Sequence, residues 1–135
     1  MTGFSLKIVT PDGLQFDGLA EELVVRTTTG DMGILAGHIN CVAPLGMGRA
    51  TVMTDGVKRY AACIGGMVSV IDGNVVLVPT TFEWADKIDP DRAERSRQRA
   101  KQVLDDKSSG SMDIVLAQAR LRRALLRKDI AANYK

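Results

Sequence analysis

Hydrophobic and polar positions divide the chain into two parts with different periods. Up to Pro79, short runs rich in β-branched residues lie between turn signals, at residues 6–9, 22–26, 49–53, 57–61, 67–71 and 75–78. Asp55-Gly56 and Asp72-Gly73 predict hairpin turns, because glycine tolerates the positive φ that tight hairpins need. Many short strands at close spacing favour an antiparallel β-sandwich or flattened barrel over a parallel sheet with crossover helices.

Beyond Pro79 the pattern becomes helical. Asp89 is placed to cap a helix whose first turn contains Pro90, and this helix is expected to end at residue 104 or 105. Only one glycine, Gly110, follows Pro79, and it lies in a predicted loop. Asp113 is expected to open a second helix that continues to about residue 132. The sequence therefore predicts a helical hairpin after the sandwich, with domains at 1–86 and 87–135.

The apolar stripes of the two predicted helices consist mainly of small residues. The expected stripe positions are Ala93, Ala100 and Leu104 in the first helix and Ile114, Ala117, Leu121, Ala124 and Leu125 in the second. Such side chains allow close packing but bury little apolar surface. Since burial contributes roughly 25 cal/mol per Å² of apolar surface, they add little stability. A hairpin that opens at small cost and a hairpin that stays permanently docked both fit this pattern.

Charge is distributed unequally between the two predicted domains. Residues 1–86 contain five basic and nine acidic side chains, a net charge of −4, and residues 87–135 contain 13 and 7, a net charge of +6. The total of +2 is too small to indicate a nucleic-acid partner. The sequence shows neither a signal-peptide pattern at its start nor an apolar stretch of about 18 residues, so we expect partners to mediate any membrane association.

The sequence offers little catalytic chemistry. His38 is the only histidine, no cluster has metal-ligand spacing, and no serine or cysteine lies in a nucleophile elbow. Glu21 and Glu22 are neighbours on a predicted strand, where their side chains point to opposite faces. Cys41 and Cys63 lie in apolar stretches, which favours buried reduced thiols over a disulfide. We expect no catalytic residue, no metal site and no required cofactor.

Basic residues form a stripe on the second predicted helix. Arg120, Arg123 and Arg127 fall on one face, with Arg122 and Lys128 beside them. A charge run of this kind is most often a solvated face. Nucleic acid is disfavoured because no aromatic residues are interleaved for base stacking. The remaining interpretations are an acidic protein surface and a phosphate-bearing ligand.

Four motifs resemble the epsilon subunit of F-type ATP synthases in order and spacing. They are residues 9–13 (VTPDG), 30–38 (GDMGILAGH), 64–70 (IGGMVSV) and 88–93 (IDPDRA). The glycine-rich segment that ends at His38 is the most specific of them. The family usually has proline at the position of Ala36 and often at that of Asn40, so this loop is expected to be slightly less rigid here. The resemblance covers nearly the whole chain.

The resemblance implies a non-catalytic rotor subunit of the central stalk, a peripheral protein at the cytoplasmic face of the bacterial plasma membrane. It implies that the sandwich contacts the gamma subunit and the ring of c subunits, and Asp31 and His38 match positions at those contacts. From the residues alone, His38 is interpreted as an imidazole that bonds to the backbone of its own loop. The resemblance further implies that the alpha and beta subunits are partners, and that the extended helices meet acidic segments of the catalytic beta subunits and inhibit ATP hydrolysis. The residues expected at that contact are Arg120, Arg122, Arg123 and Arg127.

The resemblance also implies ATP as a regulatory ligand. Ile88, Asp89, Arg92 and Ala93 match the family's nucleotide motif, Arg123 and Arg127 match its paired arginines, and Glu83 matches a further ligand position. The chain has no P-loop, so guanidinium groups would hold the phosphates. Asp89 is also fully explained as a helix cap. The alternative function is a free-standing small-ligand sensor in which the helices form a lid over the sandwich.

Overall fold

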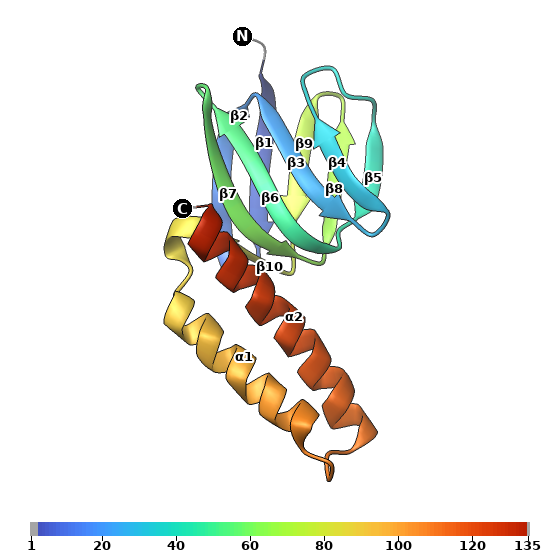
Figure 1. Cartoon of the computed structure of the whole chain (residues 1–135). Helices are drawn as coiled ribbons and strands as arrows, with labels where there is room; N and C mark the ends of the chain where they lie inside the picture. The colour runs from blue at the N-terminus through green and yellow to red at the C-terminus, as the bar shows by residue number, and fades with distance from the viewer. Residues whose placement is uncertain (1–2, 135) are drawn as a thin grey trace. The chain divides into compact units, whose positions relative to one another are not determined.

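The computed structural model describes residues 3–134. The chain forms two compact units that divide between Trp84 and Ala85, two residues before the boundary expected from the sequence. We call residues 3–84 the sandwich unit and residues 85–134 the helical unit. The first contains all the strands of the described chain and the second its helices (Figure 1).

The sandwich unit consists of short strands. They are β1 (Phe4–Thr10), β2 (Gly13–Ala20), β3 (Glu22–Thr27), β4 (Gly30–Ile34), β5 (Cys41–Pro44), β6 (Met47–Thr54), β7 (Val57–Ile64), β8 (Met67–Ile71), β9 (Asn74–Val78) and β10 (Thr81–Trp84). The six runs predicted from the sequence correspond to β1, β3, β6, β7, β8 and β9. Four further strands, β2, β4, β5 and β10, were not predicted from the sequence.

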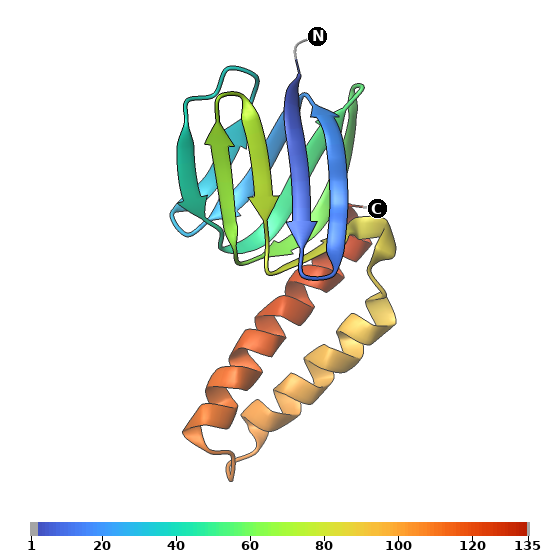
Figure 2. The same ribbon diagram turned by 180° about the vertical axis from the view of Figure 1, so that it is seen from behind.

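The strands form two five-stranded sheets. One has the order β2-β1-β9-β8-β5 and the other β10-β7-β6-β3-β4 (Figures 1 and 2). Antiparallel pairing was expected, and within the described residues it holds between all paired strands except β1 and β9, which run parallel. β1 is therefore bonded on one side to its neighbour in sequence and on the other to a strand about 70 residues later.

The hydrophobic core lies between the two sheets. Alternate residues of β1 are buried, with Leu6 and Ile8 fully inaccessible, and β3, β8 and β9 contribute Leu23, Val68 and Leu77 in the same way. This period-2 pattern is what two sheets packed face to face require. Complete burial of a leucine or isoleucine contributes roughly 1.5–3 kcal/mol, so the alternating positions account for much of the stability of this unit.

An aromatic cluster closes one side of the sandwich. Trp84 of β10 packs edge-on against Phe82 and Phe16, with ring centroids 4.9 and 6.5 Å apart. Its indole Nε1 donates to the backbone oxygen of Gln15 at 3.3 Å, and the Arg59 guanidinium lies 3.8 Å from the ring centroid. Because Trp84 and Phe82 are both buried, β10 is part of the sandwich core and not a linker.

Tight turns connect neighbouring strands. The two predicted hairpin turns are confirmed: Asp55 and Gly56 have φ of 51° and 76°, and Asp72 and Gly73 have φ of 50° and 80°. Positive φ at both central residues is characteristic of a type I′ turn, which matches the twist of the strands. Gly66, at φ +91°, is further restricted, because a methyl group there would lie 1.9 Å from the Val78 carbonyl oxygen.

The helical unit contains η1 (Ala85–Lys87), α1 (Pro90–Asp105) and α2 (Ser111–Asn133). The predicted Asp89 cap is confirmed, since its carboxylate accepts from the backbone N–H groups of Asp91 and Arg92. The second helix begins two residues earlier than expected, because Gly110 is extended at the N-cap and its carbonyl accepts from the Ile114 N–H. Asp113 lies in the first turn. Leu125, expected on the buried stripe, is 48% exposed, whereas Ala117 and Ala124 are buried.

Candidate functional site

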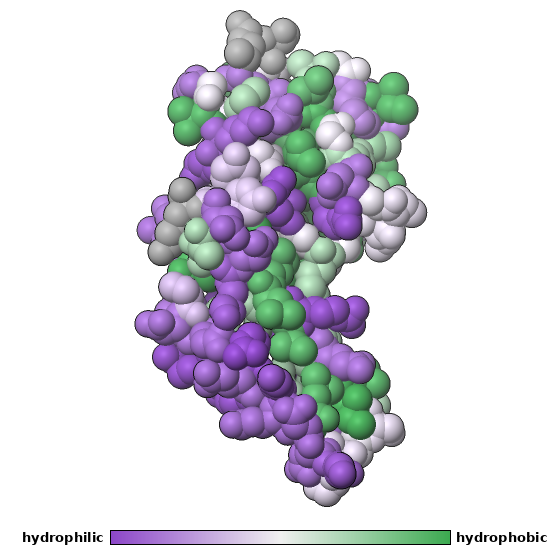
Figure 3. All heavy atoms as spheres, in the orientation of Figure 1, coloured by the Kyte–Doolittle hydropathy of each residue, from purple (hydrophilic) through white to green (hydrophobic). Residues whose placement is uncertain are grey.

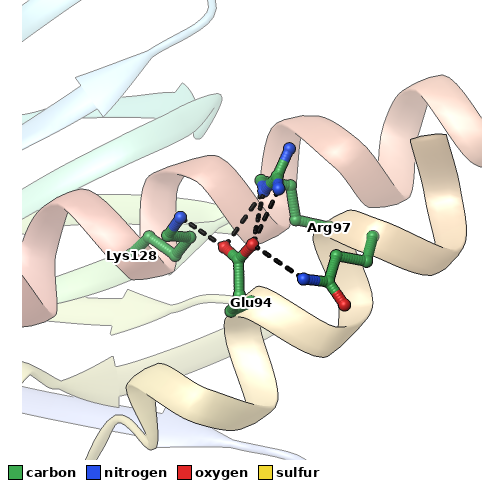
Figure 4. Close-up of polar contacts among 4 residues, drawn as sticks. Glu94, Arg97 and Lys128 are labelled. Atoms are coloured by element: carbon green, nitrogen blue, oxygen red, sulfur yellow. Dashed lines mark hydrogen bonds and ion pairs between the residues drawn. The ribbon is translucent and has the colours of Figure 1, made fainter.

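A carboxylate on α1 organises the polar contacts of the helical unit. The Arg97 side chain binds Glu94 with both Nε and Nη2, the shortest of these hydrogen bonds being 2.7 Å. Gln98 donates to the same carboxylate at 3.3 Å. From the facing helix, the Lys128 ammonium donates to Oε2 of Glu94 and forms an ion pair with it (Figure 4). One carboxylate thus joins α1 to α2.

These contacts keep Glu94 ionised. The hydrogen bond from Arg97 is the largest cause, followed by that from Lys128, and together they lower the Glu94 pKa from its ordinary value of 4.5 to about 2. The same interaction raises the pKa of Arg97. The side chains are 27–39% exposed, so water screens the attraction. This cluster was not predicted from the sequence, although the spacing of Glu94 and Arg97 was a visible signal for their same-helix pair.

The residues of the nucleotide motif lie at the start of α1. Asp89 and Arg92 are exposed, and the Asp89 carboxylate is used as the helix cap. Ile88 and Ala93 are buried, so their side chains serve packing. Of the four positions, only Asp89 and Arg92 present polar side chains to solvent.

The paired arginines lie on α2. The helices are antiparallel, and the Glu94–Lys128 contact shows that this part of α2 runs beside the start of α1. Arg123, which is exposed, lies five residues or about 7.5 Å along the helix from Lys128, and the half-buried Arg127 precedes Lys128 directly. The structure therefore brings this arginine pair to the same half of the hairpin as Arg92. Glu83 belongs to β10, in the sandwich unit.

The basic stripe of α2 is accessible to a partner. Arg120, Arg122 and Arg123 are exposed, while Arg127 is half-buried. The beginning of the same helix also exposes Met112, Val115 and Leu116, at 69%, 59% and 45%. In the view of Figure 3, hydrophilic side chains cover α1 and a hydrophobic band follows α2. α2 thus presents an apolar segment followed by a cationic one.

Asp31 and His38 occupy β4 and the loop that follows it. Asp31 is exposed and its carboxylate lies 3.3 Å from the Arg26 guanidinium. The His38 ring is half-buried, and its Nδ1 lies 2.8 Å from the carbonyl oxygen of Ile39, in agreement with the interpretation of a loop-capping imidazole. The same loop exposes Leu35 and Ile39, at 57% and 77%. This loop therefore exposes two large apolar side chains and contains a partly covered imidazole.

The loop that carries His38 is tied to the β8–β9 turn. The Asn40 amide nitrogen donates to the Asp72 carboxylate at 3.3 Å, and the Asp72 backbone N–H donates back to the Asn40 side-chain oxygen at 2.8 Å. Proline would make neither contact. Asn40 therefore restrains this loop by hydrogen bonding, where proline would restrain it through its ring.

Other residues considered in the sequence have structural explanations. The Glu21 carboxylate accepts from the Gly56 N–H at 3.0 Å and so supports the β6–β7 turn. Cys41 and Cys63 are free thiols. Cys63 is buried, as expected, and its burial raises its pKa to about 12, whereas Cys41, which was also expected to be buried, is half-buried. Residues 3–134 contain no group of three or more side chains arranged to hold a metal ion. Within the same range, no helix is both long and apolar enough to span a bilayer.

Comparison with known proteins places this architecture in a family. Residues 3–85 match the β-sandwich domain of the ATP synthase delta/epsilon chain, and residues 86–131 match the long α-helix domain of the same chain. The chain belongs to the ATP synthase delta/epsilon family. Its two family domains meet between residues 85 and 86, close to the division between the sandwich and helical units.

The sequence similarity to relatives in this family covers nearly the full length of the chain. The chain is 40% identical to the ATP synthase epsilon chain of Bacillus velezensis, covering 98% of this chain and all of the relative. It is 39% identical to the ATP synthase epsilon chain of Ruminococcus albus, and this alignment covers 97% of this chain and 98% of the relative.

The fold also recurs in a solved assembly. A chain of the Euglena gracilis mitochondrial ATP synthase, determined as OSCP/F1/c-ring, aligns with a TM-score of 0.80 at 22% identity and covers 98% of this chain and 82% of its own length. At that identity the likeness establishes the fold alone.

Proposed function

We propose that this chain is the epsilon subunit of a bacterial F-type, proton-translocating ATP synthase, a non-catalytic part of the rotor. The observation that carries the proposal is the match of both family domains in order along a chain whose relatives of equal length are epsilon chains. The chain would lie at the cytoplasmic face of the plasma membrane and associate with it through its partners.

The sandwich unit would couple the chain to the stalk. Its partners would be the gamma subunit and the c-ring, in keeping with solved relatives described as F1/c-ring and as central stalk/c-ring. Asp31 and His38 would lie at this contact, beside the exposed Leu35 and Ile39. Apolar side chains surrounded by polar ones are the usual composition of a protein interface.

The helical unit would regulate hydrolysis. Once α1 and α2 separate, the basic stripe could reach acidic surfaces of the alpha and beta subunits, where a rigid helix would obstruct the catalytic cycle. Exposed arginines are suited to this contact, because the guanidinium binds carboxylates with two parallel hydrogen bonds. The proposed contact residues are Arg120, Arg122, Arg123 and Arg127.

ATP would act as a regulatory ligand of the folded hairpin. The proposed contacts are Glu83, Ile88, Asp89, Arg92, Ala93, Arg123 and Arg127. Asp89 and Arg92 offer exposed polar side chains, whereas Ile88 and Ala93, which are buried, would contribute only backbone and packing. A ligand held by both helices would favour the folded state, since only there can both reach it.

Copurification tests the assignment to the stalk. Tagged full-length chain, expressed in its own host, should be recovered from detergent-solubilised membranes together with the gamma, alpha and beta subunits. Asp31→Lys should weaken recovery, Arg26→Gln should show whether loss of their surface ion pair alone matters, and Asp12→Lys, in the exposed β1–β2 turn, is the matched control. Recovery of the unmodified chain alone would contradict the proposal and favour a free-standing sensor.

Hydrolysis by the assembled complex tests the regulatory role. Truncation after Ile88 should raise ATP hydrolysis and leave assembly intact. Replacement of the four contact arginines by alanine keeps helix propensity high and should raise hydrolysis nearly as much. If only the truncation stimulates, the bulk of the helices and not their charge carries the inhibition; if neither does, the helices are not inhibitory.

A further inference from the structure

The packing between α1 and α2 is thin. The residues buried along the two helices include Ala93, Ala100, Ala117 and Ala124, and an alanine side chain removes little apolar surface from water. Because little apolar surface is buried at these positions, the closed hairpin has only a modest free-energy advantage. In that situation a single polar interaction between the helices has a measurable share in keeping them together.

The Glu94 cluster is arranged to provide that interaction. Arg97 binds the carboxylate from the same helix through two nitrogens, which fixes the rotamer of Glu94. With one edge of the carboxylate held in this way, its Oε2 accepts from Lys128 of the other helix. Arg97 therefore positions Glu94, and Lys128 is the residue that crosses between helices (Figure 4).

We propose that Glu94 and Lys128 form a latch that holds the helical hairpin closed. Arg97 acts in it as a positioning residue. Opening of the hairpin must break the interhelical ion pair, while the bond between Glu94 and Arg97, three residues apart on α1, can persist in a separated helix. The latch thus sets how often the helices part. Its regulatory meaning rests on the proposed function, in which the open hairpin is the inhibitory state.

Hydrogen exchange of the full-length chain tests the latch directly. Glu94→Gln and Lys128→Met should each accelerate exchange in α1 and α2 about twofold to fivefold, the range expected for a partly exposed ion pair. The double variant should exchange no faster than either single variant, because both remove the same interaction. Lys101→Met, at an exposed position of α1, is the matched control for loss of a lysine. Amides of the sandwich strands serve as the internal control for folding.

Several outcomes would overturn the latch. Additive effects of the two substitutions would show that Glu94 and Lys128 are not coupled, and unchanged exchange would show that their ion pair does not restrain the helices. An acceleration by Lys101→Met equal to that by Lys128→Met would attribute the effect to net charge. Arg97→Met should accelerate exchange less than Glu94→Gln does, and the reverse order would assign the restraint to Arg97.

Hydrolysis measurements separate the latch from the proposed function. In the assembled complex, Glu94→Gln should lower ATP hydrolysis, because a hairpin that opens more often inhibits more. Faster exchange with unchanged hydrolysis would retain the latch and contradict the regulatory role. Unchanged exchange in a complex whose hydrolysis still rises on truncation would contradict the latch and retain that role.

Discussion

Replacement of Gly66 by alanine should destabilise the sandwich unit by about 1–4.5 kcal/mol. The residue has a φ of +91°, which costs a non-glycine residue about 1–2 kcal/mol. The added methyl group would also lie 1.9 Å from the Val78 carbonyl oxygen and 2.7 Å from the Pro79 Cα. Since both are backbone atoms, a strand must move, and overpacking of this kind typically costs about 1–3 kcal/mol.

Gly73→Ala provides the matched control. Gly73 also has a positive φ, +80°, but a methyl group there would meet no atom within 4 Å. The control therefore retains the backbone cost and lacks the collision. Alanine also reduces the entropy of the unfolded chain, which offsets the backbone cost by about 0.4–1 kcal/mol in both variants. We expect Gly73→Ala to destabilise by no more than about 1–2 kcal/mol.

Urea unfolding followed by tryptophan fluorescence measures the difference. Trp84 is the only tryptophan and is buried in the aromatic cluster, so its emission reports on the sandwich unit. The two variants differ by the collision alone, about 1–3 kcal/mol, so with a denaturant slope of about 1–3 kcal/mol per molar Gly66→Ala should lower the urea midpoint by about 0.3–3 M relative to Gly73→Ala. Equal midpoints for the two variants would show that the close approach of Gly66 to the Val78 carbonyl oxygen does not exclude a methyl group at this position.

Three further predictions concern the helices and the unit boundary. Calorimetric titration should detect ATP binding that Arg92→Ala weakens by about 1.5–3 kcal/mol, the range for a charged hydrogen bond. The absence of heat at millimolar ATP would exclude ATP as a ligand of this chain. Because folding lowers the Glu94 pKa from 4.5 to about 2, its carboxylate contributes stability that is complete above pH 4.5 and is lost as the pH falls toward 2. Circular dichroism should show this acid loss of helix reduced in Glu94→Gln, and identical acid curves would contradict it. Finally, a fragment of residues 1–86 should fold and give dispersed amide resonances, whereas residues 1–80 should not, because the shorter fragment lacks β10 and its two buried aromatic residues.

The strands that the sequence predicted are those with a strong pattern of their own. β8 and β9 are rich in valine and isoleucine and are joined by Asp72-Gly73, so propensity and turn chemistry agree. β2 and β4 were missed because they contain glycine and aspartate and each buries only one residue. Both are edge strands, and hydrogen bonding to β1 and β3 defines them more than their own composition does.

The candidate site was predictable only where the signal is local. Asp89 followed by Pro90 identified the start of α1, because a helix cap depends on residues next to each other. The pairing of Glu94 with Lys128 joins positions 34 residues apart and depends on the rotation and axial offset of both helices. Leu125 shows the same limitation, since its face was assigned without knowledge of where α1 lies.

The parallel pairing of β1 with β9 affects the order in which the chain can fold during synthesis. β6 and β7 can form a hairpin as soon as both have emerged from the ribosome, since only a two-residue turn separates them. β1 is synthesised before the other strands, yet one of its two partners, β9, is complete only at Val78. Until then β1 lacks one of its two neighbouring strands, and the core of the nascent chain stays incomplete through most of the synthesis of the sandwich unit. A chaperone that shields apolar segments would act on this chain during that interval.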